Sequence, residues 1–174
     1  HVAMGASTEA YCSKEPAGIS RDEQDAFAAA SHQRAAAAHK NGLFDDEIVS
    51  VDVPQRKGDP ITVSEDEGVR GDTTAESLSK LRPAFDKEGN ITAGNASQIS
   101  DGASAVLIMS KEKAEALGMK PRARFHAFAV TGADPVTMLK GPIPATKKIL
   151  EKTGMSIDDI DLFEVNEAFA SVVL

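Results

Sequence analysis

The sequence predicts an α/β protein in which a layered sheet follows an α+β region. Two observations support this prediction. From about residue 92 onward, apolar runs of strand length alternate with helical segments in the order strand, helix, strand, helix, strand, helix, which is typical of a layered α/β sheet. The residues before that point are more polar and predict helices and a hairpin instead. We therefore place a boundary near Thr92.

Helix signals dominate the region before Thr92. Ser20 and Glu23 stand three residues apart, the spacing of a capping box, and Asn41-Gly42 is a typical helix end. Alternating apolar residues around a polar turn predict a hairpin. The expected elements are a short helix that opens at 7–9 and ends by 16–18, a helix from 20 to about 40, strands at 47–53 and 61–63, and a helix at 74–81.

The region after Thr92 contains three apolar runs of strand type. The first, at 103–109, is apolar except for Ser104, which predicts a strand buried on both faces. Helical segments with capping and stop residues lie between the runs. The other expected elements are strands at 122–131 and 162–165 and helices at 111–117, from 142 to about 153, and after 166.

Charge and composition exclude several classes of protein. The formal net charge is -8, which argues against binding to nucleic acid or to an anionic membrane surface. No apolar run approaches the ~20 residues of a membrane span. The single cysteine, Cys12, excludes an internal disulfide and is typical of an intracellular protein, so we expect a cytoplasmic location. No paired base lies near Cys12 in the sequence, so we do not expect it to be a nucleophile.

Two segments have the character of a binding site. Asn166 follows the apolar run at 162–165 and would lie at the carboxyl end of a strand, where open α/β sheets bind ligands. The alternative is that Asn166 caps a helix. Residues 91–97 form a loop of small residues that lets the backbone approach a ligand closely, although alone it is only a glycine-containing loop. His32 and His39 stand too far apart for a helical metal pair, so we expect a solvated face and no metal site.

Five segments together resemble the thiolase family. They are Ser-Arg-Asp-Glu-Gln-Asp at 20–25, Lys-Leu-Arg-Pro-Ala-Phe at 80–85, Thr-Ala-Gly-Asn-Ala-Ser-Gln-Ile-Ser-Asp-Gly-Ala at 92–103, Gly-Pro-Ile-Pro at 141–144 and Asn-Glu-Ala-Phe at 166–169. The resemblance implies part of the layered αβαβα thiolase fold. Residues 1–92 would be the insertion domain that covers coenzyme A, 93–120 the last strand and helix of the N-terminal half, and 121–174 the start of the C-terminal half.

The resemblance also implies roles for single residues. Asn166 is similar to the family's residue that holds the oxyanion-stabilising water, so it is the one catalytic residue we expect here. The implied coenzyme A and substrate contacts are Arg70 and Ser77 at the adenosine phosphate end, Phe85, Ala93 and Ser97 along the pantetheine, Ala168 and Phe169 near the pantetheine and acyl group, and Met4 at the acyl pocket. The family often has His immediately before Met-Gly, where this sequence has Ala3.

The implied activity is that of an acyl-CoA C-acyltransferase. As an acetyl-CoA C-acetyltransferase or 3-ketoacyl-CoA thiolase, it would condense two acetyl-CoA to acetoacetyl-CoA or cleave a 3-ketoacyl-CoA with coenzyme A as substrate, without a further cofactor. The family's nucleophilic Cys would lie before His1, and its His and second Cys beyond Leu174. We therefore expect a piece that is inactive alone and works beside the remaining thiolase segments in a homodimer or homotetramer. The alternative is a coenzyme A-binding or interaction protein that keeps the fold without catalysis.

Overall fold

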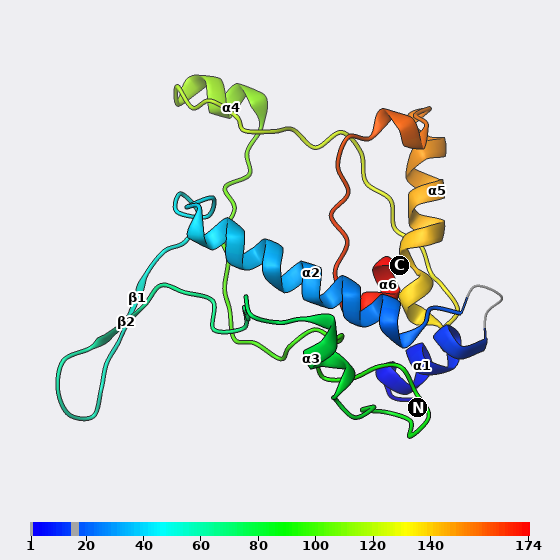
Figure 1. Cartoon of the computed structure of the whole chain (residues 1–174). Coiled ribbons are helices and arrows are strands. Elements are labelled where there is room, and N and C mark those ends of the chain that lie inside the picture. Colours follow the sequence, from blue (N-terminus) through cyan, green and yellow to red (C-terminus); the bar gives the residue numbers. More distant parts are fainter. Residues whose placement is uncertain (1, 15–17) are drawn as a thin grey trace. The chain divides into compact units, whose positions relative to one another are not determined.

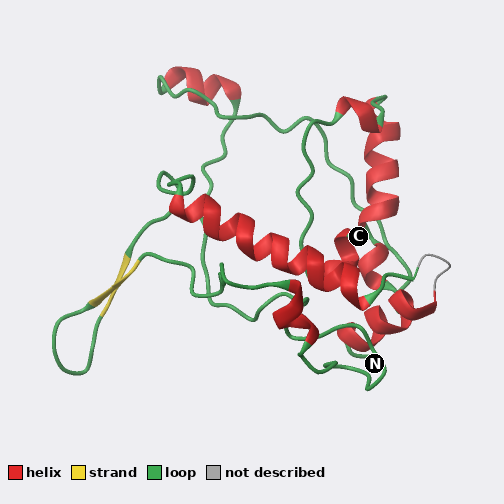
Figure 2. Ribbon diagram, in the orientation of Figure 1, coloured by secondary structure: helices red, strands yellow, loops and turns green. Residues whose placement is uncertain are grey.

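The computed structural model describes residues 2–14 and 18–174. The chain divides into two compact units, one formed by residues 1–98 with 165–174 and the other by residues 99–164. Helices make up most of the regular structure (Figure 2). The expected end of the first helix at 16–18 lies largely outside the described residues, as does the side chain of Cys12. The predicted division at residues 92 and 120 stays a prediction.

The first unit contains helices and one hairpin, which Figure 1 labels. Their order along the chain is close to the predicted one, with α1 opening a few residues earlier than expected. The elements are the helices α1 (Met4–Lys14), α2 (Arg21–Lys40), α3 (Ala75–Ser79) and α6 (Ala170–Val173), and the strands β1 (Val51–Val53) and β2 (Ile61–Val63).

Helix α2 begins where its capping residues predict. The backbone N–H of Glu23 donates to Ser20 Oγ over 3.2 Å, and the backbone N–H of Ser20 donates to Glu23 Oε2 over 2.8 Å. These bonds satisfy amide groups that a helix start otherwise leaves without partners. The helix continues through alanine, the residue with the highest helix propensity, and ends at Asn41. The predicted helix from 20 to about 40 is confirmed.

The core of the first unit lies where α2 packs against α3 and α6. Ala28 and Ala29 of α2 are buried together with Leu78 of α3. Figure 1 shows α3 beside the N-terminal half of α2. The small alanine side chains let neighbouring segments approach α2 closely, and the buried Ile91 and Phe169 complete the apolar interior.

The hairpin forms, but its first strand is shorter than predicted. Strands β1 and β2 pair antiparallel, with Val51 opposite Val63 on one face. On the other face, Thr62 Oγ1 donates to Asp52 Oδ1 over 2.6 Å. Residues 47–50 are not in a strand: the turn that closes α2 extends through residue 47, and the backbone N–H groups of Glu47 and Ile48 donate to the Phe44 carbonyl.

Three predicted strands are absent from the chain as the structure describes it. Residues 103–109, 122–131 and 162–165 have neither helix nor strand. The side chains of Val106 and Leu107, which point to opposite faces in an extended segment, are 80% and 71% exposed, so the predicted burial of 103–109 on both faces is wrong for this chain. A strand exists through hydrogen bonds to a neighbouring strand, and no described segment pairs with these three.

The helices predicted for the second unit are confirmed. They are α4 (Lys111–Ala116) and α5 (Pro142–Thr153), accompanied by the 3₁₀-helices η1 (Met138–Lys140) and η2 (Ile157–Asp159). Lys148 and Lys152 of α5 donate to the backbone carbonyls of Val130 and Phe128 over 2.6 and 3.0 Å. Part of segment 122–131 therefore gives its carbonyls to lysine side chains rather than to a strand. Within the described chain, no helix has the length and apolarity needed to cross a bilayer.

Candidate functional site

The side chain of Asn95 holds the small-residue loop at 92–98 in place. Its oxygen accepts a hydrogen bond from the Thr92 N–H over 2.8 Å. Its amide N–H groups donate to Asp25 Oδ1 over 2.9 Å and to the Asn90 carbonyl over 3.0 Å. Asn95 is only 3% exposed, so water does not compete for these bonds. The conformation of the loop therefore depends on one buried amide.

The same loop pairs with the segment that leads into α6. The Ser97 N–H donates to the Ala168 carbonyl, and the Ala170 N–H donates to the Asn95 carbonyl, both over 2.9 Å. The structure thus joins two segments that are far apart in sequence, and both come from motifs of the resemblance. Their pairing lies within the first unit.

Asn166 lies in the turn that leads into this pairing. The Ala168 N–H donates to the Asn166 carbonyl over 3.0 Å, and Phe169 stands opposite Ala96 in an antiparallel bridge. Asn166 itself is exposed. The residue in the capping position of α6 is Phe169, so Asn166 is not a helix cap in this structure. The catalytic role expected for Asn166 stays a prediction.

Two phenylalanines form an apolar contact next to the paired segments. The rings of Phe85 and Phe169 have centroids 6.0 Å apart and planes at 85°, an edge-to-face arrangement. Phe169 is buried, whereas Phe85 is 44% exposed. A Cβ atom at Gly5 would collide with the Phe85 ring, so the chain next to Met4 also approaches this ring closely. These contacts bring the segments of Met4, Phe85 and Phe169 together.

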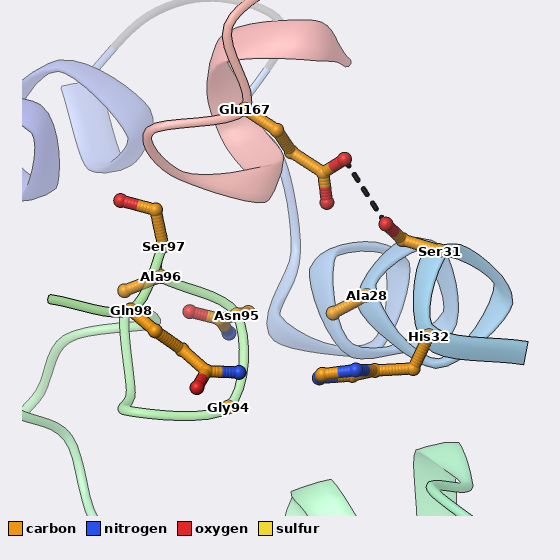
Figure 3. A pocket seen from close by; sticks show the side chains of 9 residues that line it. All are labelled: Ala28, Ser31, His32, Gly94, Asn95, Ala96, Ser97, Gln98 and Glu167. Carbon is orange, nitrogen blue, oxygen red and sulfur yellow. Dashed lines mark hydrogen bonds between the residues drawn. The ribbon is translucent and has the colours of Figure 1, made fainter. Parts of the chain in front are cut away.

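A cavity of about 180 Å³ opens between α2 and the loop (Figure 3). Helix α2 contributes Ala28, Ser31 and His32, the loop contributes residues 94–98, and Glu167 lies on the remaining side. Ser31 Oγ donates to Glu167 Oε2 over 3.1 Å, as the dashed line in Figure 3 marks. The walls combine small residues with hydroxyl, imidazole, amide and carboxylate groups. Such a lining suits a slender polar ligand better than a bulky apolar one.

Two family models match the chain in sequence order. The thiolase N-terminal domain matches residues 1–112, and the thiolase C-terminal domain matches residues 119–174. This chain belongs to the thiolase family.

Curated relatives carry acetyl-CoA acetyltransferase names. The chain is 54% identical over 171 residues to the acetyl-CoA acetyltransferase of Chromobacterium violaceum, covering 98% of the chain and 43% of the relative. It is 55% identical over 168 residues to the acetyl-CoA acetyltransferase of Allochromatium vinosum, covering 97% of the chain and 42% of the relative. The chain thus spans less than half the length of these thiolase relatives.

Solved structures give the same family. The acetyl-CoA acetyltransferase of Bacillus anthracis superposes with a TM-score of 0.94 at 44% identity, over 99% of this chain and 43% of that one. The acetyl-CoA acetyltransferase of Syntrophomonas wolfei gives a TM-score of 0.88 at 42% identity, with 99% and 42% coverage. The predicted α/β thiolase fold is therefore confirmed, although three of its expected strands stay unpaired in this chain.

His32 is the thiolase cavity residue that sequence reasoning missed. The Arg70 backbone N–H donates to His32 Nδ1 over 3.2 Å, so the neutral ring carries its proton on Nε2. Figure 3 shows the ring facing the loop that contains Gly94 and Gln98. His32 follows Ala28 by one helical turn on the cavity side and is half-buried there, so its face of α2 lines the cavity as well as meeting solvent. Among the described residues, no three His, Cys, Asp or Glu side chains gather to hold a metal ion.

Of the predicted site residues, Ser97 is the one that lines the cavity. Arg70, Ser77 and Ala93 are three of those that lie outside its walls. The side chain of Arg70 is exposed, and this residue reaches the cavity only through its backbone bond to His32. The Ser77 hydroxyl accepts from the Thr74 N–H, and the Ser77 N–H donates to Thr74 Oγ1, both over 3.1 Å, which forms the capping box of α3. Ala93 is exposed at the start of the loop. The roles assigned to these residues stay predictions.

Proposed function

We propose that this chain is the coenzyme A-covering part of a thiolase that acts as an acyl-CoA C-acyltransferase. The whole protein would condense two acetyl-CoA to acetoacetyl-CoA or cleave a 3-ketoacyl-CoA with coenzyme A. One observation carries the proposal: the hydrogen bond from the Ser97 N–H to the Ala168 carbonyl joins the small-residue loop to the Asn166 turn. A pantetheine slot and an oxyanion donor need to be adjacent in this way.

The chemistry of the ligand suits the residues assigned to it. Pantetheine is long and thin and carries amides, so a loop of small residues with Ser97 suits its polar groups, and the Phe85–Phe169 pair offers an apolar wall. The adenosine end is anionic, and the exposed guanidinium of Arg70 can donate to a phosphate bidentately. Coenzyme A is the substrate, and the proposed reaction needs no metal.

In the condensation direction, the proposed reaction begins when a Cys thiolate of the remaining thiolase segments attacks the thioester carbonyl of acetyl-CoA. Negative charge then develops on the carbonyl oxygen, and a water held by the Asn166 amide donates to it. A thioester to the Cys forms as the bond to coenzyme A breaks, and the coenzyme A thiolate leaves. A His and a second Cys from the same segments move the protons. We place this chain beside those segments in a homodimer or homotetramer in the cytoplasm. The acetyltransferase names of the relatives favour this reading over a coenzyme A-binding protein without catalysis.

A segment exchange tests the proposal. This chain replaces the matching segment of the Chromobacterium violaceum enzyme, which supplies the rest of the thiolase sequence. We expect the chimera to cleave acetoacetyl-CoA with coenzyme A at a kcat/KM within about tenfold of the parent relative, a loss of ~1.4 kcal/mol. The isolated chain serves as the control and should give no turnover.

The outcomes of the exchange distinguish the two candidate functions. A folded chimera that binds coenzyme A in calorimetry but gives no product supports the binding protein without catalysis. A folded chimera that neither binds coenzyme A nor turns over contradicts both. Circular dichroism and sedimentation of the chimera establish that it is folded before either conclusion is drawn.

A further inference from the structure

We propose that Asp25 is a positioning residue of the coenzyme A site, acting through Asn95 on the loop that carries Ser97. The inference deepens the proposed function and rests on it for its catalytic consequence. Its structural half stands on its own, because it concerns which bonds hold the loop to helix α2.

The two oxygens of the Asp25 carboxylate are both engaged. Oδ1 accepts from the Asn95 amide over 2.9 Å, and Oδ2 accepts from Arg21 Nε over 2.6 Å. Asp25 is 1% exposed, so this carboxylate has been taken out of water at a cost that its partners must offset. A carboxylate placed in this way accepts strong, directional bonds, and the amide of Asn95 is held in one orientation.

Asn95 passes this constraint to the site loop. Its side-chain oxygen also accepts from the Thr92 N–H, and its side-chain amide donates to the Asn90 carbonyl. Its backbone carbonyl accepts from the Ala170 N–H. The loop start and the segment leading into α6 therefore share one anchor. Without Asp25 the buried amide would lose a partner, and the loop would lose its fixed distance from helix α2.

Arg21 extends the same network to α3. Its Nη2 donates to the Leu78 carbonyl over 2.7 Å and to the Leu81 carbonyl over 3.1 Å. A Cβ atom at Gly94 would lie 2.5 Å from Leu78 Cδ2, so the loop also approaches α3 very closely. The clamp, which we define as Arg21, Asp25 and Asn95, thus holds the loop between two helices. None of its three side chains needs to touch the ligand.

Hydrogen exchange on the full chain tests the structural half. Asp25→Asn preserves the size of the side chain but replaces one of its two acceptor oxygens by an NH₂ group. The single remaining oxygen cannot accept from both Arg21 Nε and the Asn95 amide, so one of these donors would face the new NH₂ group. We expect the amides of Ser97 and Ala170 to exchange about tenfold faster in this variant. The matched control is Ser20→Ala, which weakens the capping of the same helix and should speed only the Glu23 amide. Equal protection of Ser97 and Ala170 in all three proteins would overturn the clamp.

A swap of the two side chains keeps the test decisive if a single variant unfolds. Asn95→Asp removes the donor and places two carboxylates against each other, which should loosen the loop at least as much as Asp25→Asn. The double variant Asp25→Asn/Asn95→Asp restores one donor–acceptor pair in reverse. We expect its exchange rates at Ser97 and Ala170 to lie between those of the parent and the single variants. A double variant that exchanges faster than both singles contradicts the inference.

Kinetics in the segment-exchange chimera test the catalytic half. With the loop loosened, Asp25→Asn should raise the KM for coenzyme A about tenfold and change kcat by less than about threefold. Ser20→Ala should leave both values within about twofold of the parent chimera. A fall in kcat with unchanged KM would refute the positioning role. If the parent chimera itself is inactive, the proposed function fails, and hydrogen exchange still decides whether the clamp holds the loop.

Discussion

The side chain of Asn95 donates a 2.9 Å hydrogen bond to the carboxylate of Asp25, 70 residues earlier in the chain. This bond joins a helix of the fold to the loop of the candidate site. Both residues are almost fully buried, so the contact cannot be replaced by water without opening the unit. The fold and the site therefore share one polar network, and substitutions in that network should change stability and ligand binding together.

Arg21 should matter more to stability than an exposed cation on the same unit. Arg21→Gln removes the bond to Asp25 and the donors to the carbonyls of Leu78 in α3 and of Leu81 just after it. It leaves a buried carboxylate without its cation. We expect the free energy of unfolding to fall by about 2–3 kcal/mol, measured by urea denaturation. Lys80→Gln removes an (i, i+4) ion pair in which the side chains of Lys80 and Glu76 are 70% and 84% exposed. This variant should lower the free energy of unfolding by less than about 0.5 kcal/mol. Equal losses for the two variants would contradict the importance of the buried network.

A side chain at Gly94 should force the site loop away from α3. A Cβ there would lie 2.5 Å from Leu78 Cδ2 and 2.7 Å from Leu81 Cδ1, and Leu78 is buried. Gly94→Ala should therefore destabilise the unit by about 1–3 kcal/mol in thermal unfolding. Gly102→Ala is the control, because no atom lies within 4 Å of its added Cβ, and its effect should stay within about 1 kcal/mol. If both alanines are tolerated equally, the loop is not as closely packed as described.

Helices could be predicted from the sequence because their starts and ends depend on near neighbours. Ser20 and Glu23 satisfy each other's backbone groups within one turn, and Gly154 ends α5 with φ of 70°, a conformation that favours glycine. Strands depend instead on a partner that lies elsewhere in the chain. The segment at 122–131 has the right alternation, but alternation does not reveal whether a neighbour is present.

The candidate site could be predicted only in part, for the same reason. The motifs around Ser97 and Asn166 were identified by resemblance, and their hydrogen-bonded pairing follows from the structure. The places of Asp25 and His32 could not be predicted. Helical periodicity indicates which residues share a face of α2, but it does not show what that face meets.

Ser77 allows its two possible roles to be separated. Its hydroxyl takes part in the capping box of α3 with Thr74, and the resemblance also assigns it to the adenosine phosphate end of coenzyme A. Ser77→Ala and Thr74→Ala each remove one half of the box and should lower stability similarly, by about 0.5–2 kcal/mol. We expect only Ser77→Ala to raise the KM for coenzyme A in the chimera, by a few-fold. Identical KM values for the two variants would leave Ser77 as a helix cap and nothing more.

The cap of α2 should make stability depend on pH in a defined direction. The Ser20 hydroxyl and then the Ser20 backbone N–H donate to Glu23, which lowers the pKa of this carboxyl below its ordinary value. The ionised form therefore favours folding. Its contribution is present above the unfolded-state pKa of about 4.3 and is lost as pH falls through the lower folded-state pKa.

Glu23→Gln checks this direction. Its melting temperature should lie below that of the parent at pH 7, and the difference should shrink steadily as the pH falls below about 4. The Ser20→Ala variant lacks the hydroxyl donor. In that variant, the difference in melting temperature between Glu23 and Gln at position 23 should depend less on pH. A difference that grows on acidification would mean that the carboxyl is bound in its protonated form.

Asn166 provides the sharpest separation of catalysis from folding. Its side chain is exposed and the capping position of α6 belongs to Phe169, so Asn166→Ala should change the free energy of unfolding by less than about 0.5 kcal/mol. In the chimera, however, removing the amide that holds the oxyanion water should lower kcat by about 10²–10³-fold and change KM little. Glu167→Gln is the neighbouring control: the Gln side-chain oxygen can still accept from Ser31, so it should retain most of the activity. A stable Asn166→Ala variant with parental kcat would remove the catalytic role from this chain, and an unstable variant with parental kcat would make Asn166 a structural residue after all.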